Sequence, residues 1–481
     1  MKRILLSSLL VANTSLASIF TDFYITPSGG HTNSGHTEGG PIANFVNGGW
    51  STVTYVYTCP PGSDLSGVTN GGWLSVYNDG ATVGTFSGYV TNVDDTADTI
   101  SLNLGANRVF DSVPTTSVTA RSAVFGGAWN FPNGTSSDYP FSGLRGESVS
   151  PDFSSISRLN IKSNIYVTTG LIGSFTYPGR IQGYDTITGD GGRPIIRPNA
   201  GAAFVMMTIS SAGGLYDLIF DASNFTSGTS AGITGTTRDR LYRVTVIGAM
   251  GSGIFLSSGD CIVVECEAFG NGRNAVGHGF SLPVDSMAIN CIAHHNVHSG
   301  FNIGGGALFN CISYENGSDG FASSVNLQNA VLVNCDSYNN ATNGFSALTT
   351  QGVYWHLVNC NAFANGEYGL SAVGQFQGQI DNFMVGSGTM TNDFGTLSSD
   401  AVVTFGTNNF ITYPADTTPW VDPDVGNFSL RRTANSAIAA GRGFFPNTTN
   451  TSLTIGYPDL GAAQSSATNA TSGGGSFTFG Q

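Results

Sequence analysis

Short apolar stretches separated by Gly and Asn recur through residues 238–372 of this chain. In five of them a Cys opens an alternation of small and bulky side chains, as in Cys266, Glu267, Ala268 and Phe269. Successive side chains of a strand point to opposite faces, so this alternation predicts strands that bury the Cys and Ala positions and turn the bulky residue outward. The runs are short and β-branched and lack sustained helical periodicity, which favours strands over helices.

The five stretches are copies of one repeat. In each, an Asn follows the Cys by five residues, and a Gly paired with an apolar residue comes next. The Cys residues lie 25, 20, 24 and 25 residues apart, at Cys266, Cys291, Cys311, Cys335 and Cys360. An interval in this range predicts a solenoid in which equivalent residues of successive coils stack in columns. Coils of this length with several short strands predict a parallel β-helix, whose neighbouring strands lie about 4.8 Å apart.

Two more columns follow from the repeat. The Asn column is expected to occupy the left-handed bend between strands, to satisfy turn backbone groups and to form a ladder of amides; its members are Asn271, Asn296, Asn316, Asn340 and Asn365. The apolar column is expected to point inward, each ring stacked on the next; its members are Phe280, Phe301, Phe321, Phe345 and Leu370.

Composition limits the class of protein. The 481 residues include 66 Gly, and only 10% are charged, while 40% are hydrophobic. A chain this apolar can build a long core, which excludes general disorder. The net charge of −14 makes binding to nucleic acid through phosphate neutralisation unfavourable, so no nucleic-acid partner is expected.

The N-terminus has the pattern of a secretory signal peptide over residues 1–17. Lys2 and Arg3 precede an apolar run, and the small residues around Ala17 are typical of a cleavage site. The alternative is an apolar N-terminal strand or anchor. No later segment has the roughly 20 apolar residues of a membrane span. The expected location is therefore extracellular, in solution or at the cell surface.

Seven Cys residues are present, five of them in the repeat. In-register Cβ atoms about 4.8 Å apart lie beyond the usual disulfide range of about 3.5–4.5 Å. The column is therefore expected to hold buried, mostly free thiols that behave as small hydrophobic groups. A straight column does not converge on a tetrahedral zinc ion, so no metal site is predicted there.

The rest of the chain divides by its pattern. Residues 22–150 differ from the repeats and are expected to supply the initial strand of the solenoid and an inserted small β domain. Residues 151–465 are expected to form the β-helix with a C-terminal cap, which a solenoid needs to close its exposed strand edges. The tail at 466–481, rich in Ser, Thr, Gly and Asn, is expected to be disordered.

Together these features resemble the right-handed parallel β-helix superfamily of pectate lyases, polygalacturonases and many phage tailspikes. The resemblance rests on three sets of residues: the repeated Asn-Cys pairs (Asn290–Cys291, Asn310–Cys311, Asn334–Cys335, Asn359–Cys360), the opening segment 22–30, and the closing segments 423–430, 435–438 and 457–462. It covers most of residues 22–465. It implies an all-β, right-handed, single-stranded parallel β-helix, and it implies contact with carbohydrate.

An outward aromatic column is the first candidate for binding. It comprises Phe269, His294, Tyr314, Tyr338 and Phe363, one per coil. A solvent-facing stripe of rings at regular spacing could stack against the sugar rings of a polysaccharide. The alternative is a stabilising aromatic ladder, or a surface covered by a loop.

Histidines and acids gather on the same coils and are the candidate catalytic groups. His295 and Glu315 share a column, as do Glu267 and Asp336, with two Ile residues between them. A glycosidase needs two carboxylates roughly 5 to 9.5 Å apart, which acids one or two coils apart can supply. The candidate acids and bases are Glu267, Glu315 and Asp319, assisted by His278 and His295. The alternatives are ordinary polar corner residues and a metal site built from His and acids.

A lyase chemistry is the other candidate reaction. In the family that the chain resembles, it uses Lys or Arg as a base and usually Ca²⁺ on clustered Asp. After residue 17 the only Lys is Lys162, so Arg273 is the best candidate base or clamp for a substrate carboxylate. Asp260 and Asp285 could be Ca²⁺ ligands or turn formers, and no compact Asp cluster occurs in the repeats. No metal ligands are therefore assigned, and Ca²⁺ is expected only if the protein is a lyase.

The sequence leaves two functions open. The first is a secreted protein that binds or cleaves an extracellular polysaccharide as a lyase or glycosidase. The second is a non-catalytic rod, such as a viral tailspike or fibre, which would form a homotrimer, or a cell-surface adhesin.

Overall fold

The computed structural model describes residues 21–26, 41–51, 53–70, 73–78, 86–103, 118–126, 157–168, 174–175, 180–209, 213–274, 277–323, 329–381, 383–386, 392–394, 402–405, 411–413, 420–425 and 427–430. The predicted signal peptide and tail lie outside these ranges. Within them the chain forms two compact units. One contains the described residues up to Lys162 and residues 180–182, and the other contains the rest.

The first unit contains a closed antiparallel barrel, which confirms the predicted small N-terminal β insertion. Its strands are β2(Pro41–Ser51), β3(Val56–Thr58), β4(Trp73–Asn78), β5(Phe86–Asp94), β6(Thr99–Asn103) and β7(Val118–Gly126), in the order β2-β3-β6-β5-β4-β7. Trp50, Tyr57 and Leu74 are among the residues that fill its core. The initial strand β1(Thr21–Ile25) pairs in parallel with β8(Ser157–Lys162), as the predicted start of a solenoid requires.

The second unit is a parallel β-helix, so the predicted fold class is confirmed. Each complete coil contributes a strand to each of three sheets. What we call the first sheet contains the strands that follow the Cys column: β9(Ile165–Thr168), β12(Ile195–Pro198), the second half of β15(Gly214–Asp221) and of β18(Arg240–Ile247), β21(Glu267–Phe269), β24(Ile292–His294), β27(Ile312–Tyr314), β30(Asp336–Tyr338), β32(Asn361–Phe363), β34(Met384–Gly386) and β37(Ile411–Tyr413).

The second sheet follows the Asn column, and the third sheet precedes the Cys column. The second sheet comprises β10(Ser174–Phe175), β14(Met207–Ile209), β17(Ile233–Gly235), β19(Ile254–Leu256), β22(Phe280–Leu282), β25(Phe301–Ile303), β28(Phe321–Ser323), the start of β31(Phe345–Val358) and of β33(Tyr368–Asp381), and β35(Asn392–Phe394). The third comprises the first halves of β15 and β18, then β20(Ile262–Val264), β23(Met287–Ile289), β26(Gly306–Phe309), β29(Asn329–Val333), the ends of β31 and β33, and β36(Val402–Phe405).

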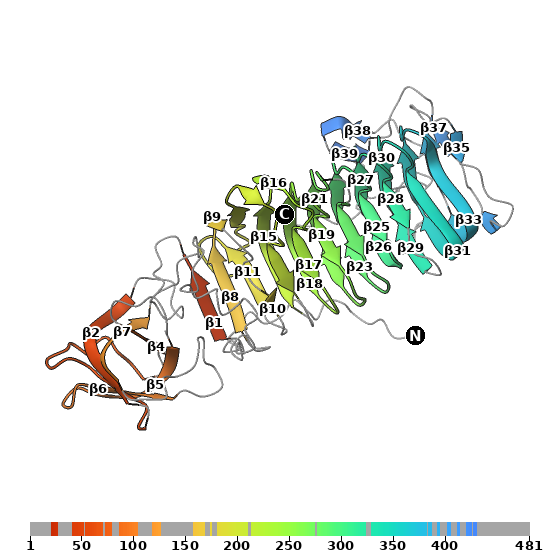
Figure 1. The fold of residues 1–481 in the computed structure, drawn as a ribbon. Helices are drawn as coiled ribbons and strands as arrows, with labels where there is room; N and C mark the ends of the chain where they lie inside the picture. The colour runs from red at the N-terminus through yellow and green to blue at the C-terminus, as the bar shows by residue number, and fades with distance from the viewer. Residues whose placement is uncertain are drawn as a thin grey trace, which may run out of the picture. The chain divides into compact units, whose positions relative to one another are not determined.

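Strands of successive coils lie side by side along this unit (Figure 1), and all these pairings are parallel. Three smaller features complete the description: β11(Arg180–Tyr184), the parallel pair of β13(Gly201–Ala202) and β16(Phe225–Ser227), and the antiparallel pair of β38(Trp420–Asp422) and β39(Asn427–Leu430), joined by the 3-10 turn η3(Pro423–Val425). Among the described residues, no helix has the length and apolar character needed to cross a membrane.

The five Cys residues of the repeat form an interior column, as predicted. Each side chain is buried and carries a free thiol. The thiol of Cys291 interacts with those of Cys266 and Cys311 on the neighbouring coils. Burial raises the pKa of Cys266, Cys311 and Cys335, so these thiols stay protonated and pack as small apolar groups.

The Asn column forms the predicted amide ladder. Nδ2 of each Asn donates to Oδ1 of the next, over distances of 3.0, 2.9, 2.8 and 2.9 Å from Asn271 to Asn365. The same Oδ1 atoms accept the backbone N–H of the preceding Asn at 3.1 Å. Both the side-chain amide and the backbone N–H of these Asn residues are therefore hydrogen-bonded inside the core, where an unsatisfied polar group would be costly.

The left-handed bend lies one residue earlier than predicted. The residues with positive φ are those immediately before the ladder, namely Gly270, His295, Glu315, Asn339 and Ala364. A second left-handed column precedes the Cys residues, at Glu265, Asn290, Asn310, Asn334 and Asn359, where Asn is well suited to the conformation. The bend turns the chain at the corner, and the following Asn then directs its amide inward.

The apolar column forms the predicted ring stack. Phe280, Phe301, Phe321 and Phe345 lie 4.8, 5.0 and 4.9 Å apart between ring centroids, with interplanar angles of 4 to 8°. All four side chains are fully buried. The stack therefore fills the interior beneath the second sheet with one continuous row of rings.

Candidate functional site

The outer face of the first sheet carries the predicted aromatic column and Glu267. The register aligns Thr245, Glu267, Ile292, Ile312 and Asp336 in one outward column. It aligns a second outward column two residues later, containing Ile247, Phe269, His294, Tyr314, Tyr338 and Phe363. The predicted columns are therefore present, with Glu267 two positions before Phe269 on the same strand.

The aromatic column is open at one end and covered at the other. Phe269 and His294 stack at 4.8 Å, and His294 and Tyr314 at 4.7 Å, while Tyr338 and Phe363 stack at 6.3 Å. Phe269 and His294 remain partly exposed, whereas Tyr314, Tyr338 and Phe363 are only 8%, 7% and 3% exposed. In this structure the last three rings do not present a surface to a sugar, so only Phe269 and His294 remain as an aromatic platform.

The C-terminal β38–η3–β39 segment contacts the covered end. The hydroxyl of Tyr338 donates to Oδ1 of Asp424 in η3, over 2.7 Å. Asp336 and Asn361 on the same outer face are fully buried, and Nδ2 of Asn361 donates to Oδ1 of Asp336 at 2.7 Å. Asp336 is thus sealed away from the open part of the face and is not paired with Glu267.

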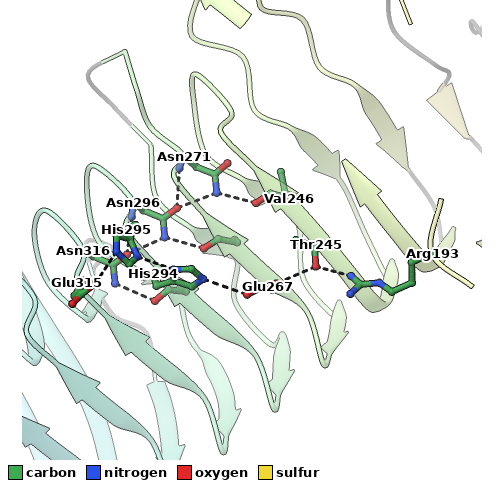
Figure 2. A network of polar contacts seen from close by, with 12 residues as sticks. Arg193, Thr245, Val246, Glu267, Asn271, His294, His295, Asn296, Glu315 and Asn316 are labelled. Atoms are coloured by element: carbon green, nitrogen blue, oxygen red, sulfur yellow. Dashed lines mark hydrogen bonds and ion pairs between the residues drawn. The ribbon is translucent and has the colours of Figure 1, made fainter. Parts of the chain in front are cut away.

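A continuous chain of polar contacts crosses the open end of the face (Figure 2). Arg193 donates from a guanidinium N–H to the hydroxyl of Thr245, which bonds to Oε2 of Glu267 at 3.3 Å. Oε1 of Glu267 lies 3.3 Å from Nε2 of His294. Nδ1 of His294 lies 2.8 Å from Nδ1 of His295, and Nε2 of His295 lies 2.7 Å from Oε2 of Glu315.

Electrostatics keep Glu267 ionised. Its hydrogen bond with His294 lowers the pKa of this carboxyl against the opposing effect of partial burial, and Thr245 and Arg193 lower it further. Burial, together with the nearby Glu267 and Glu315, raises the pKa of Tyr314 to about 12, so the phenol stays neutral. The site therefore presents one anchored carboxylate, an imidazole pair and a second carboxylate within one connected network.

Two predicted site residues have structural roles in this geometry. Asp319 is buried, and its Oδ1 accepts from the Thr342 hydroxyl at 2.6 Å and from the Asn343 side-chain amide at 2.7 Å. Arg273 donates to three backbone carbonyls, those of Gly248, Ala222 and Phe225, at 2.9, 3.2 and 2.7 Å. None of these hydrogen bonds involves Glu267 or its partners, so neither residue joins the polar chain described above.

His278 lies on the corner before the second sheet, away from the polar chain. Its ring is 6.0 Å from that of His298, and its Nδ1 atom is buried without a hydrogen-bond partner. Burial and, to a smaller extent, the nearby His298 lower the pKa of His278 to about 4, against an opposing effect of Asp319. The imidazole is therefore neutral at physiological pH, and it serves as a packed corner residue.

The lowered pKa of His278 predicts acid sensitivity. In the unfolded chain the pKa of His is near 6.5, so as the pH falls the unfolded state binds a proton before the folded state does. The folded protein therefore has its full stability above pH 6.5 and loses part of it as the pH falls toward 4. The free energy of unfolding should fall by about 2–3 kcal/mol over this range because of this one group. Urea unfolding at pH 7 and pH 4 should show a smaller drop for His278→Gln than for the parent; equal drops would contradict the assignment.

Metal binding finds no support in the described part of the chain. There, no three or more His, Cys, Asp or Glu side chains gather in a way that could hold a metal ion. Asp260 and Asp285, the two candidate Ca²⁺ ligands, have left-handed backbones with φ of 64° and 55°. This is the conformation of turn-forming Asp residues.

Arg193 and Thr245 belong to the site and were not predicted from the sequence. Thr245 follows Val244, which occupies the Cys column of a degenerate sixth repeat, so extending the columns by one coil would have placed Thr245 above Glu267. Arg193 lies before the clear repeats, 52 residues ahead of Thr245. Arg193 lies outside the sequence repeat, so the repeat could not predict its position, and only the folded structure shows it at this face.

Comparisons with known proteins bear on the fold. Neither the protein-family models nor the curated proteins yield a match to this sequence. Among solved structures, pectate lyase Pel9A is similar with a TM-score of 0.50 and 15% identity, over 69% of this chain and 93% of that one. The Azotobacter vinelandii mannuronan C-5 epimerase AlgE4 A-module (TM-score 0.42, 17% identity, 53% of this chain and 82% of that one) and the Dettilon tailspike protein gp208 (TM-score 0.40, 11% identity, 58% and 68%) are also similar. The chain therefore has the right-handed parallel β-helix fold that its sequence predicted, the fold that it shares with pectate lyase Pel9A.

Proposed function

We propose that this protein is a secreted protein that binds an extracellular polysaccharide across the open end of the first sheet and acts on it there. The exposed parts of the Phe269 and His294 rings would contact a sugar ring, and Glu267 and Glu315 would accept hydrogen bonds from sugar hydroxyls. The observation that carries the proposal is the meeting of a partly exposed ring pair with a connected set of ionisable side chains on one open face.

The concentration of charge supports a functional role. The chain has only 31 acidic, 17 basic and seven His residues among 481. Five of them, Arg193, Glu267, His294, His295 and Glu315, form one connected chain (Figure 2). An uncharged surface would suffice for a rigid rod, so clustering scarce ionisable groups beside exposed rings favours ligand chemistry over scaffolding.

Within this site Glu267 is the candidate acid–base residue. It is held by donors on both sides, from Thr245 and from His294, and a fixed carboxylate is what proton transfer to or from a sugar oxygen requires. Glu315 is separated from it by the imidazole pair, so the two carboxylates do not form a directly paired dyad. Proton transfer through Glu267 fits this geometry better than a pair of facing acids.

Binding tests the proposal first. Affinity electrophoresis against neutral and uronate-containing polysaccharides should show at least one ligand. Phe269→Ala should weaken its binding about two- to tenfold, because one lost ring contact contributes about 0.5–1.5 kcal/mol. Phe255→Ala is the matched control, since Phe255 is 40% exposed on the second sheet. Equal weakening by both changes would place binding elsewhere.

Chemistry is tested with the same panel. Incubation should release reducing or unsaturated ends from the bound polysaccharide, and Glu267→Gln should lower the rate at least about 100-fold while binding persists. An absence of binding and products across the panel, together with a homotrimer by light scattering, would overturn the proposal in favour of a structural rod.

A further inference from the structure

The hydrogen bonds of the imidazole pair at the centre of the polar chain determine how many protons its two rings must carry. His294 and His295 face each other through their Nδ1 atoms at 2.8 Å, and their Nε2 atoms face Glu267 and Glu315 at 3.3 and 2.7 Å. Two neutral imidazoles carry one N–H each, so together they can supply only two of these three bonds.

The far end of the chain fixes the direction of the first bonds. A guanidinium group can only donate, so the hydroxyl of Thr245 accepts from Arg193 and turns its own proton to Oε2 of Glu267. Glu267, whose pKa is lowered chiefly by His294, is a carboxylate that only accepts. Nε2 of His294 must therefore carry a proton, and its Nδ1 faces a second imidazole nitrogen.

Packing holds the His294 ring in this orientation. The ring is stacked between Phe269, at 4.8 Å and 10°, and Tyr314, at 4.7 Å and 8°. Tyr314 also meets the His295 ring edge-on at 5.9 Å. His294 is 13% exposed and His295 is 55% exposed, so one ring is set into the face and the other reaches solvent.

We propose that His294 and His295 share one extra proton between two carboxylates, so that the pair stores a proton and can pass it to Glu267. The four groups Glu267, His294, His295 and Glu315 then hold three protons in three hydrogen bonds, with a net charge of −1. The central proton lies on Nδ1 of either ring, and its move from His295 to His294 carries the positive charge from the exposed ring to the buried one.

The transfer balances without any further reactant. The Nδ1–H bond of His295 breaks, its electron pair stays on that nitrogen, and a new N–H bond forms at Nδ1 of His294. The Nε2–H of His294 can then pass to Glu267, which becomes a neutral acid next to the ring platform. The sharing of the proton is a property of the free protein, whereas its delivery to a sugar oxygen rests on the proposed function.

Nuclear magnetic resonance of protein labelled with ¹⁵N-His tests the sharing directly. We expect a scalar coupling between the two Nδ1 nuclei across their hydrogen bond at neutral pH, and three nitrogen-bound protons on the two rings. Two rings with one proton each, with or without a coupling, would overturn the proposal. The spectrum of the parent protein decides this without any variant.

Two variants assign the signal. Glu315→Gln keeps an oxygen acceptor but removes the charge that balances the extra proton, so the two rings should carry two nitrogen-bound protons in place of three. His298→Gln changes a nearby His outside the polar chain and should leave all three protons in place. A third proton lost in this variant and kept in Glu315→Gln would contradict the assignment. A shared proton in a protein that binds no polysaccharide would support this inference and contradict the proposed function. Polysaccharide binding by a protein whose two rings carry only two protons would support the proposed function and contradict this inference.

Discussion

Asn316→Ala should destabilise the protein by about 4 kcal/mol, because it breaks the buried ladder at its centre and each orphaned buried polar group costs about 1–3 kcal/mol. Oδ1 of Asn316 accepts both the backbone N–H of Asn296 at 3.1 Å and its side-chain amide at 2.9 Å. Its own amide bonds Asn340, Ser313 and the carbonyl of Ala293. Since a folded domain is typically stable by about 5–15 kcal/mol, this single change should remove a large part of the total.

Urea unfolding followed by circular dichroism measures this effect. Asn339→Gly is the matched control, since Asn339 precedes the ladder on the next coil, is exposed and has a φ of 49° that Gly adopts freely. The control should change the free energy of unfolding by less than about 1 kcal/mol. Similar losses in both variants would show that the corner backbone, and not the amide ladder, determines stability here.

Phe321→Ala should have an effect of similar size, about 3–5 kcal/mol, which is typical of removing a buried ring. Phe321 lies between Phe301 and Phe345, with ring centroids at 5.0 and 4.9 Å. Its removal leaves a cavity in a continuous stack, and the two neighbouring rings each lose one stacking partner. The backbone spacing of the coils limits how far these rings can move to fill the space.

The midpoint of denaturant unfolding is again the measurement. Phe255→Ala removes the same side chain from the outer face of the second sheet, where it is 40% exposed, and should cost less than about 1 kcal/mol. If Phe321→Ala unfolds at the same denaturant concentration as Phe255→Ala, the stack is not a main source of stability. The contrast between the variants isolates burial, because the residue types are identical.

Much of the fold could be predicted from the sequence because the repeat itself encodes which residues are neighbours. Once Cys266 and Cys291 are recognised as equivalent, the pairing of Glu267 with Ile292 and of Phe269 with His294 follows from simple counting. The burial of the Cys, Asn and Phe columns follows as well. The left-handed residue was misplaced by one position, since Asn suits both a bend and a ladder, and composition does not distinguish the two uses.

The candidate site was harder to predict because its limits depend on contacts that no period records. Tyr338 belongs to the aromatic column by register, yet it bonds Asp424, 86 residues later in the chain. Arg193 reaches Thr245 from a coil that lacks the repeat. Register predicts which side chains share a face, whereas segments from outside the repeats determine which of them a ligand could reach.

The seven free thiols determine how the stability of this protein depends on the redox state of its environment. None of the seven forms a cross-link in the folded structure, so folding needs neither an oxidant nor a disulfide isomerase. All seven side chains are buried, and buried sulfur reacts slowly with oxidants. The architecture should therefore persist equally well in reducing and oxidising environments.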